Sequence, residues 1–250
     1  MNLKTLLKGK SDSMRRERMF RLFWDKPIKT WNPIIGCLHD CYHGRCWARI
    51  QARRQKHRCF YCYHFHPHIH RERLGKFPKS GVVFVVSMGD MWGDWIPSEW
   101  IRSILKSMKP YWEKPDLIFF FETKNPARYI DFADLIPPNS ILSTTIETNK
   151  DYKVSKAPPP KERYLAMVSS ELKKFAKHVS IEPIMKFDLK AMYRWIQEID
   201  PKMVSIGYDN YNAKLPEPTV EETRKLIDKL RRFTLLEIKK DRRGFYSKLM

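Results

Sequence analysis

Residues 82–87 read Val-Val-Phe-Val-Val-Ser, an apolar run rich in β-branched side chains that predicts a buried strand. A helical pattern follows this run, because Pro97 precedes apolar residues that recur three and four positions apart between Ile101 and Met108. Further strand-like runs alternate with such patterns, which is typical of parallel strands joined by crossover helices. These strands are expected at residues 30–35, 117–123, 141–147, 178–182, 203–207 and 234–238.

The stretches between these strands carry helix start signals. Thr219 and Glu222 form a capping box before an amphipathic pattern. Another helix is expected to begin near Cys46, with Trp47 and Ile50 facing inward. Six strand-then-helix units and a closing strand favour an α/β fold with a partial or open (β/α) barrel, and a doubly wound open sheet is the alternative.

The length and the charge pattern predict the organisation of the chain. A chain of 250 residues with 42% hydrophobic content can bury one substantial core, so we expect one (β/α) domain over residues 30–250. Residues 1–29 are interpreted as a basic arm, and residues 57–80 as a Cys/His-rich basic insertion. The apolar runs are too short to cross a bilayer and lysines interrupt the N-terminal apolar residues, so we expect a cytoplasmic protein without a membrane partner.

The chain is strongly basic. Its 48 Lys and Arg residues against 28 Asp and Glu residues give a formal net charge of +20, which favours contact with DNA or RNA. Residues 45–79 hold ten Lys and Arg residues and one acid, Glu72. A solvated charged surface accounts for the same composition, so both interpretations stay open at this point.

Cysteine and histidine are concentrated in one segment. All five cysteines and seven of the eight histidines fall within residues 37–70. In a chain expected in the cytoplasm, such a cluster is more often a metal site than a set of disulfides. Cys37, Cys41 and Cys46 occupy a loop between an expected strand and an expected helix. Three thiolates can hold three irons of a [4Fe-4S] cluster and leave the fourth iron open to a cofactor or substrate.

Zinc is the alternative metal for this loop. The three cysteines with His39, His43 or His57 would complete a tetrahedral site, and Cys59 with Cys62 could pair with two of the earlier thiols. Spacing alone leaves iron and zinc equally open.

Cys59 and Cys62 also form a pair of their own, with His57, His64 and His66 beside them. The pair could bind zinc, contribute to a second cluster or form a disulfide, and the adjacent histidines favour a second metal site. Histidines recur at every second position over residues 64–70, which would place them on one side of a strand, although a basic solvated segment explains them as well.

The cysteine loop belongs to a longer motif. It reads Thr-Trp-Asn-Pro-Ile-Ile-Gly-Cys at residues 30–37, then Cys41, then Cys-Trp-Ala-Arg at residues 46–49. Further landmarks follow in order: His-Pro-His at 66–68, Val-Val-Ser-Met-Gly-Asp-Met-Trp at 85–92, Thr-Lys-Asn-Pro at 123–126 and Ser-Ile-Glu-Pro at 180–183. The combination covers most of the chain and resembles a phage and prokaryotic branch, of unknown function, of the radical S-adenosylmethionine superfamily. Members of that superfamily typically have three and then two residues between their cysteines, whereas this chain has three and then four.

The resemblance implies a partial or open (β/α)6 barrel of the radical S-adenosylmethionine type, with the Cys/His-rich insertion after its first strand. It implies a [4Fe-4S] cluster on Cys37, Cys41 and Cys46, with S-adenosyl-L-methionine bound at the open iron. The protein would then be an enzyme that generates a 5′-deoxyadenosyl radical with an electron from a reductant such as ferredoxin or flavodoxin. Its substrate is unidentified, and the charge favours nucleic acid.

Cofactors of barrel enzymes lie at the C-terminal ends of the strands, and these ends supply the candidate binding residues. Asp90 is the candidate acceptor for the methionine ammonium group, and Gly89 would permit close backbone approach. Lys124 would pair with the methionine carboxylate, and Glu147 with ribose hydroxyls or the substrate. Trp47 would shield the cluster or stack on adenine. The other candidates at these ends are Ser87, Thr145 and Glu182.

A non-catalytic module is the alternative function. In that case the segment from Cys37 to Cys62 forms one or two zinc or iron–sulfur sites that fold a basic loop onto nucleic acid.

Overall fold

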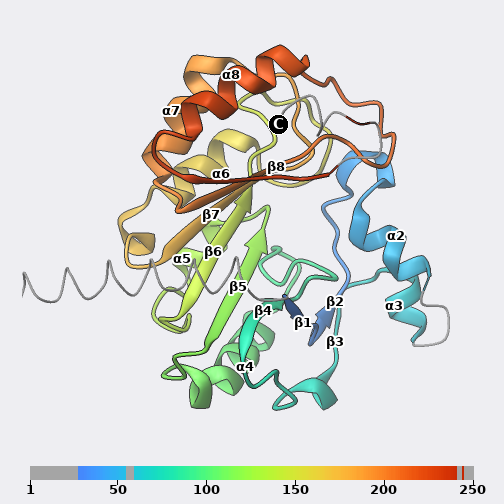
Figure 1. Cartoon of the computed structure of the whole chain (residues 1–250). Coiled ribbons are helices and arrows are strands. Elements are labelled where there is room, and N and C mark those ends of the chain that lie inside the picture. Colours follow the sequence, from blue (N-terminus) through green and yellow to red (C-terminus); the bar gives the residue numbers. More distant parts are fainter. Residues whose placement is uncertain (1–27, 55–58, 241–243, 245–250) are drawn as a thin grey trace, which may run out of the picture.

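Figure 1 shows the computed structural model of the chain, which describes residues 28–54, 59–240 and 244. Seven strands form one sheet in which every neighbouring pair is parallel. The strands cross the sheet in chain order: β1 (Lys29–Trp31), β4 (Gly81–Val85), β5 (Leu117–Thr123), β6 (Ser140–Thr145), β7 (Ala176–Ile181), β8 (Met203–Ile206) and β9 (Leu235–Ile238).

The strand order decides between the two expected architectures. A doubly wound sheet reverses its order at a switch point, whereas each new strand here is added on the same side of the previous one. The edge strands β1 and β9 do not pair with each other within the described residues, so the sheet stays open. The prediction of a partial or open (β/α) barrel is therefore confirmed.

Helices follow the strands β4 to β8, and α6, α7 and α8 lie on one face of the sheet in Figure 1. Side chains alternate along β5: Phe119 and Phe121 join the large core that contains the buried helix residues, whereas Ile118 and Phe120 face the other side. Among the described residues, the other face has a small apolar cluster, which leaves room there for polar groups. These helices are α4 (Ser98–Met108), α5 (Ala127–Ile130), α6 (Pro160–Met167), α7 (Leu189–Ile199) and α8 (Val220–Leu230).

The capping box predicted before α8 is present. Thr219 Oγ1 accepts from Glu222 N at 3.1 Å, and the Glu222 carboxylate accepts from Thr219 N at 2.7 Å. These bonds satisfy two backbone donors that a helix start leaves unpaired. None of the helices in the described segments has the length and apolar character needed to cross a bilayer.

The Cys/His-rich insertion lies between β1 and β4, after the first strand as predicted. The expected strand at 30–35 is divided at Asn32 and Pro33, so that its second half pairs antiparallel with a later strand of the insertion. The segment between β1 and β4 contains β2 (Ile34–Ile35), α2 (Trp47–Arg53), α3 (Phe60–His64) and β3 (His68–Ile69). Of these elements, α3 and β3 fall within the insertion predicted at residues 57–80.

The orientation predicted for α2 is wrong. Ala48 and Ala52 are its buried residues, whereas Trp47 is 46% exposed and Ile50 is half-buried. The helix packs against Phe65 in a narrow cluster, and small alanine side chains suit so close an approach. The predicted basic arm, residues 1–29, lies outside the described residues except for its last two positions.

Candidate active site

A cavity of about 830 Å³ opens at the carboxyl ends of the strands, between the sheet and the cysteine loop. Glu147 is not among its lining residues, although every other candidate from the strand ends is. A smaller cavity of about 210 Å³ near Lys177 and Asp200 contains none of the predicted site residues. The predicted residues that line the larger cavity are Cys37, Cys41, Cys46, Trp47, Ser87, Gly89, Asp90, Lys124, Thr145 and Glu182.

Two glycines let the cysteine loop meet the end of β4. Gly36 N donates to Met88 O at 3.0 Å, and Gly36 has a φ of +101°. A Cβ on Gly36 would lie 2.3 Å from the carbonyl carbon of His66, and a Cβ on Gly89 would lie 2.6 Å from Gly36 O. The close approach predicted at Gly89 is therefore made to the chain itself, and it fixes the entry to the loop.

The longer spacing between Cys41 and Cys46 is absorbed by a left-handed turn. Tyr42 and His43 have φ values of +55° and +53°, a region that few non-glycine residues occupy. The turn reverses the chain, so that Cys46 returns to the cavity wall formed by Cys37 and Cys41. The two additional residues thus do not remove any of the three thiols from the cavity.

The three thiols are free, with Cys41 buried and the other two half-buried. Burial raises the pKa of Cys41 to about 12, and burial together with the Asp90 carboxylate and the neighbouring thiols raises that of Cys37. His39 N donates to Cys37 Sγ at 3.4 Å. Metal binding removes such thiol protons, and N–H···S bonds tune the potentials of clusters. Three adjacent thiols beside an open cavity therefore fit a cluster with three protein ligands.

Glu147 is buried behind the cavity wall, with 2% of its side chain exposed. Its Oε2 accepts from Arg163 Nη1 at 2.8 Å, and its Oε1 accepts from Lys124 Nζ and from the Tyr42 hydroxyl. Burial opposes ionisation, but Lys124 and Arg163 outweigh it and hold the pKa of Glu147 well below its usual range. The predicted contact with ribose or substrate does not fit this position. Glu147 instead anchors the cysteine loop through Tyr42.

Lys124 lies in the cavity wall, with 12% of its side chain exposed. Its ammonium group pairs with Glu147 and donates to the Tyr42 hydroxyl at 2.6 Å. An ammonium group has three N–H donors, so these two partners leave one for a ligand.

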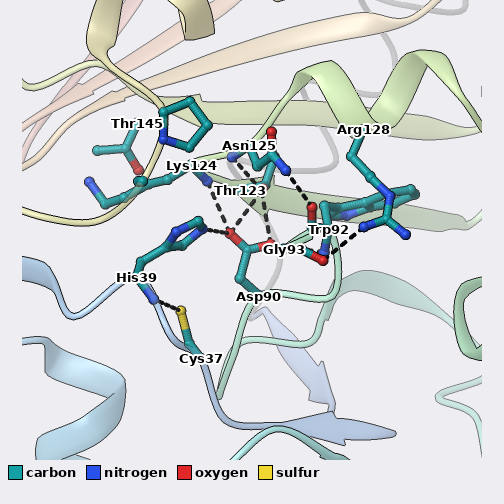
Figure 2. Close-up of polar contacts among 12 residues, drawn as sticks. Cys37, His39, Asp90, Trp92, Gly93, Thr123, Lys124, Asn125, Arg128 and Thr145 are labelled. Atoms are coloured by element: carbon teal, nitrogen blue, oxygen red, sulfur yellow. Dashed lines mark hydrogen bonds and ion pairs between the residues drawn. The ribbon is translucent and has the colours of Figure 1, made fainter. Parts of the chain in front are cut away.

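Asp90 connects three segments, as Figure 2 shows. Its Oδ2 lies 3.0 Å from His39 Nε2 and accepts from Lys124 N at 3.1 Å, and its Oδ1 accepts from Trp92 N at 3.0 Å. The Thr123 hydroxyl lies 2.8 Å from both oxygens. Since a carboxylate offers about four acceptor positions, the chain already satisfies Asp90. Direct acceptance from a methionine ammonium group, as predicted, does not fit this arrangement.

The loop after Asp90 is held by residues that follow β5 (Figure 2). Asn125 Nδ2 donates to Trp92 O at 3.0 Å, and Arg128 Nη1 donates to Gly93 O at 3.0 Å. These bonds fix the loop that follows Asp90, which is itself a lining residue of the cavity.

A row of polar side chains crosses the sheet on the cavity side. Ser143 Oγ donates to Glu122 Oε1 at 3.1 Å and lies 2.8 Å from His178 Nδ1. His178 Nε2 lies 3.0 Å from Ser205 Oγ, which donates to Glu237 Oε2 at 2.8 Å. Burial, with a smaller contribution from Lys239, lowers the pKa of His178 to about 3, so its ring is neutral. The row gives the inner face of the barrel its polar character.

Four other predicted residues occupy the cavity wall. Trp47 stands half in solvent, and Thr145 is buried. Ser87 Oγ donates to Asn32 Oδ1 at 3.2 Å. Glu182 lies near the polar row, and burial is the main cause that raises its pKa to about 7.

The sequence reasoning did not identify several residues that build this site. Asn32 and Tyr42 lie in or next to the quoted cysteine motif, so their position was a usable signal. His39 was considered only as a zinc ligand, whereas it contacts Asp90. The strands also held a signal, because polar residues such as His178 interrupt otherwise apolar runs. Arg163 had no signal that separates it from the other basic residues on helices.

Cys59 and Cys62 lie outside the cavity. The structure brings them together with His68 and His70, whereas the predicted neighbours His64 and His66 are not part of this group. His57 lies outside the described residues.

The likeness to solved structures agrees with the fold. Spore photoproduct lyase complexed with dinucleoside spore photoproduct matches with a TM-score of 0.56 and 9% identity over 84% of this chain and 75% of that chain. A cysteine-to-alanine mutant of that lyase with the same dinucleoside gives the same values. A tyrosine-to-phenylalanine mutant of the lyase gives a TM-score of 0.55 and 9% identity over 85% of this chain and 76% of that chain. At this identity the likeness concerns the fold.

The sequence comparisons give a family and no individual relative. No curated protein matches the chain. The family described as "Protein of unknown function (DUF5131)" matches residues 24–204, which is more than half of the chain. The chain therefore belongs to the DUF5131 family.

Proposed function

We propose that this chain is a radical S-adenosylmethionine enzyme that holds a [4Fe-4S] cluster on Cys37, Cys41 and Cys46. One observation carries the proposal: all three thiols, despite their unusual spacing, line one cavity at the carboxyl ends of an open parallel barrel. Active sites of barrel enzymes lie at this end of the strands. Three thiolates leave one iron of a cubane without a protein ligand, which suits a cluster that binds a cofactor.

The fold and the cavity support this assignment. The superfamily that the sequence resembles and the spore photoproduct lyases share the open barrel. The volume of about 830 Å³ lies in the range of roughly 300–1,000 Å³ that small-molecule sites occupy. When bound, the cluster and S-adenosylmethionine supply one-electron cleavage of the sulfonium and a 5′-deoxyadenosyl radical that abstracts hydrogen. A cytoplasmic reductant such as ferredoxin or flavodoxin would supply the electron.

The residues nearest the cysteine loop would bind the cofactor. Ser87, Gly89 and Thr145 line the cavity and would contact S-adenosylmethionine, and Lys124 has an N–H donor left for its carboxylate. Asp90 acts as a positioning residue, because its carboxylate holds the cysteine loop through His39 and the end of β5 through Thr123 and Lys124.

Trp47 has a role of its own in this proposal. It lines the cavity next to the third cysteine and keeps 46% of its surface exposed. An exposed aromatic ring at this position offers a stacking surface for adenine and covers the cluster from solvent. Its exposure argues against the inward-facing position that the helical pattern predicted for it.

The polar row on the inner face would contact the substrate. Glu182, with a pKa of about 7, exchanges a proton near neutral pH and stands beside this row in the cavity. Such a carboxyl group can give or take a proton from a bound substrate.

Nucleic acid is the substrate class that we favour. The net charge of +20 and the ten Lys and Arg residues over positions 45–79 favour a polyanion. Two of the similar structures contain a dinucleoside spore photoproduct. A protein of similar fold is thus known in complex with a dinucleoside, which supports nucleic acid as the substrate class of this basic chain.

Anaerobic reconstitution with iron and sulfide tests the proposal. The wild type should bind about four irons at the three-cysteine loop and absorb broadly in the visible range. Replacement of Cys37, Cys41 or Cys46 by alanine should abolish both signals. His43→Asn is the matched control, because His43 is exposed in the same loop and asparagine tolerates its left-handed backbone.

Two outcomes would contradict this proposal. Iron content and spectrum that survive all three single cysteine variants would show that the ligands lie elsewhere. A colourless wild type that takes up zinc at the loop in place of iron would support the non-catalytic binding module instead.

A further inference from the structure

Four ligand atoms converge in the insertion, away from the cavity. The sulfurs of Cys59 and Cys62 and one ring nitrogen each of His68 and His70 all lie within 4.8 Å of one another. Cys62 Sγ is 3.4 Å from His68 Nε2 and 3.2 Å from His70 Nε2. Cys59 Sγ is 3.8 Å from His68 Nε2, and the two Nε2 atoms are 2.9 Å apart.

These separations are those of ligands around a single metal ion. Zinc binds cysteine sulfur at about 2.3 Å and histidine nitrogen at about 2.0–2.1 Å, so the donors of a tetrahedral site lie roughly 3.3–3.8 Å apart. The sulfur–nitrogen distances of 3.2, 3.4 and 3.8 Å lie in or next to that range. Only the two nitrogens are somewhat closer than a bound ion would hold them.

The outer nitrogens of both histidines are also fixed. His70 Nδ1 lies 2.8 Å from Glu72 Oε1, and His68 Nδ1 lies 2.7 Å from His66 O. A proton on each Nδ1 is donated to these oxygens, which leaves the Nε2 lone pairs directed at the metal position. Metal-binding histidines usually make this second hydrogen bond to a carboxylate or a carbonyl oxygen. In a run of histidines that is merely solvated, we would not expect both ring nitrogens of two histidines to lie next to partner atoms.

Two other uses of the cysteine pair fit less well. A [2Fe-2S] cluster with two cysteines and two histidines places the two kinds of ligand on different irons. Here Cys62 approaches both histidine nitrogens as closely as ligands of one ion do. No disulfide joins Cys59 to Cys62 among the described residues, and a disulfide would not account for the two histidine nitrogens beside Cys62.

The four residues are attached to the strand that leads into the cysteine loop. His68 of β3 pairs with Ile35 of β2, two residues before Cys37. Cys62 is 1% exposed and packs in the same apolar cluster as Ile35, and Cys37 N donates to Phe65 O at 3.4 Å. An ion that joins α3 to β3 would therefore hold the base of the cysteine loop.

We propose that Cys59, Cys62, His68 and His70 bind one Zn²⁺ ion, which fixes the insertion and the start of the cysteine loop. Two thiolates and two neutral imidazoles balance the charge of the ion. The four ligands leave no open position, which is the pattern of a structural zinc site. The site shares no residue with the three-cysteine site, so the two proposals can fail independently.

Metal analysis of protein purified with zinc in the medium tests the proposal. The wild type should contain one zinc per chain, and the combined change Cys62→Ser with His70→Ala should abolish it. His64→Ala, a histidine of the same segment outside the four-residue group, should leave the zinc content unchanged. Since the double variant could fail to fold, His70→Cys provides the second arm, because a Cys₃His set also binds zinc and should retain the ion.

The combined alanine replacement of Cys37, Cys41 and Cys46 separates the two proposals. It should remove iron and keep one zinc per chain. Zinc that disappears in this variant, or that persists in the double variant, would overturn the assignment. A wild type or a His70→Cys variant that folds without zinc would also overturn the assignment.

The hydrogen bond from His70 to Glu72 gives a graded test. Glu72→Gln should weaken zinc binding about 10–100-fold in competition with a chromophoric chelator, since this is the usual effect of losing such a partner. Glu113→Gln, another exposed glutamate, should leave the zinc affinity unchanged. Equal zinc affinity of wild type and Glu72→Gln would contradict the proposed geometry.

Discussion

Replacing Glu147 with glutamine keeps the size of the side chain and removes a buried negative charge between two cations. Arg163 and Lys124 have side chains only 4% and 12% exposed, so water cannot take over the role of the carboxylate. The amide also presents N–H donors to Arg163 or to Tyr42, which are donors themselves. We therefore expect a large loss of folding free energy.

The magnitude follows from the burial of the ion pairs. Breaking a buried pair costs about 3–5 kcal/mol, because a charge remains uncompensated in the interior. Since the amide oxygen can still accept from Lys124, we expect a value near the lower end, about 3 kcal/mol. In a chain of this size 1 kcal/mol corresponds to about 2–4 °C, so the melting temperature should fall by roughly 6–12 °C.

The pH dependence of stability follows from the lowered pKa of Glu147. The pKa of Glu147 is lower in the folded chain than its ordinary value of 4.5. Its contribution to stability is therefore complete above pH of about 4.5 and is lost as the pH falls through the folded pKa. The difference in stability between wild type and Glu147→Gln should accordingly be full at neutral pH and shrink in acid.

Urea denaturation followed by circular dichroism measures the effect, with both proteins at equal metal content. Glu162→Gln is the matched control, because Glu162 is an exposed carboxylate next to Arg163 in the chain, and its loss should change stability by less than about 0.5 kcal/mol. A Glu147→Gln variant that loses less than about 1 kcal/mol, or no more than Glu162→Gln, would refute the reasoning.

Three further predictions concern the cavity and its partners. Because the folded pKa of Glu182 is raised to about 7, the wild type loses stability as the pH rises from about 4.5 to about 7. Glu182→Gln should flatten this part of the plot of unfolding free energy, measured by urea denaturation, against pH. An unchanged slope would contradict the raised pKa of Glu182. Asp90→Asn should weaken S-adenosylmethionine binding about tenfold or more in equilibrium dialysis, whereas Asp94→Asn, whose side chain is 83% exposed, should not; equal affinities would remove the positioning role. Binding of single- or double-stranded DNA should weaken linearly with the logarithm of salt concentration, and an affinity independent of salt would exclude phosphate contacts as its basis.

The strands were the part of the fold that the sequence predicted best. The run at residues 117–123 matches β5 residue for residue, because a buried parallel strand needs a continuous apolar sequence. The face of α2 was predicted wrongly, since hydrophobicity favoured Trp47 while the close packing of the helix selects alanine. The size of side chain that fits against a neighbouring element depends on tertiary packing, and sequence periodicity does not report it.

The candidate site, like the fold, was predicted from the sequence only in part. The three cysteines and the residues at the strand ends were predicted to lie together, because parallel strands bring their carboxyl ends to one edge. The roles of Asp90 and Glu147 were not predictable, since they depend on His39, Tyr42 and Arg163, which lie 51, 105 and 16 residues away in the chain. The polar row likewise depends on the register of five strands.

The central claim is that the three-cysteine loop supports S-adenosylmethionine cleavage, and product analysis of the reduced, iron-loaded protein tests it most directly. Wild-type protein with a strong reductant should convert S-adenosylmethionine to methionine and 5′-deoxyadenosine, and Cys41→Ala should form neither. Protein that carries about four irons and binds S-adenosylmethionine, yet yields no 5′-deoxyadenosine, would contradict the claim.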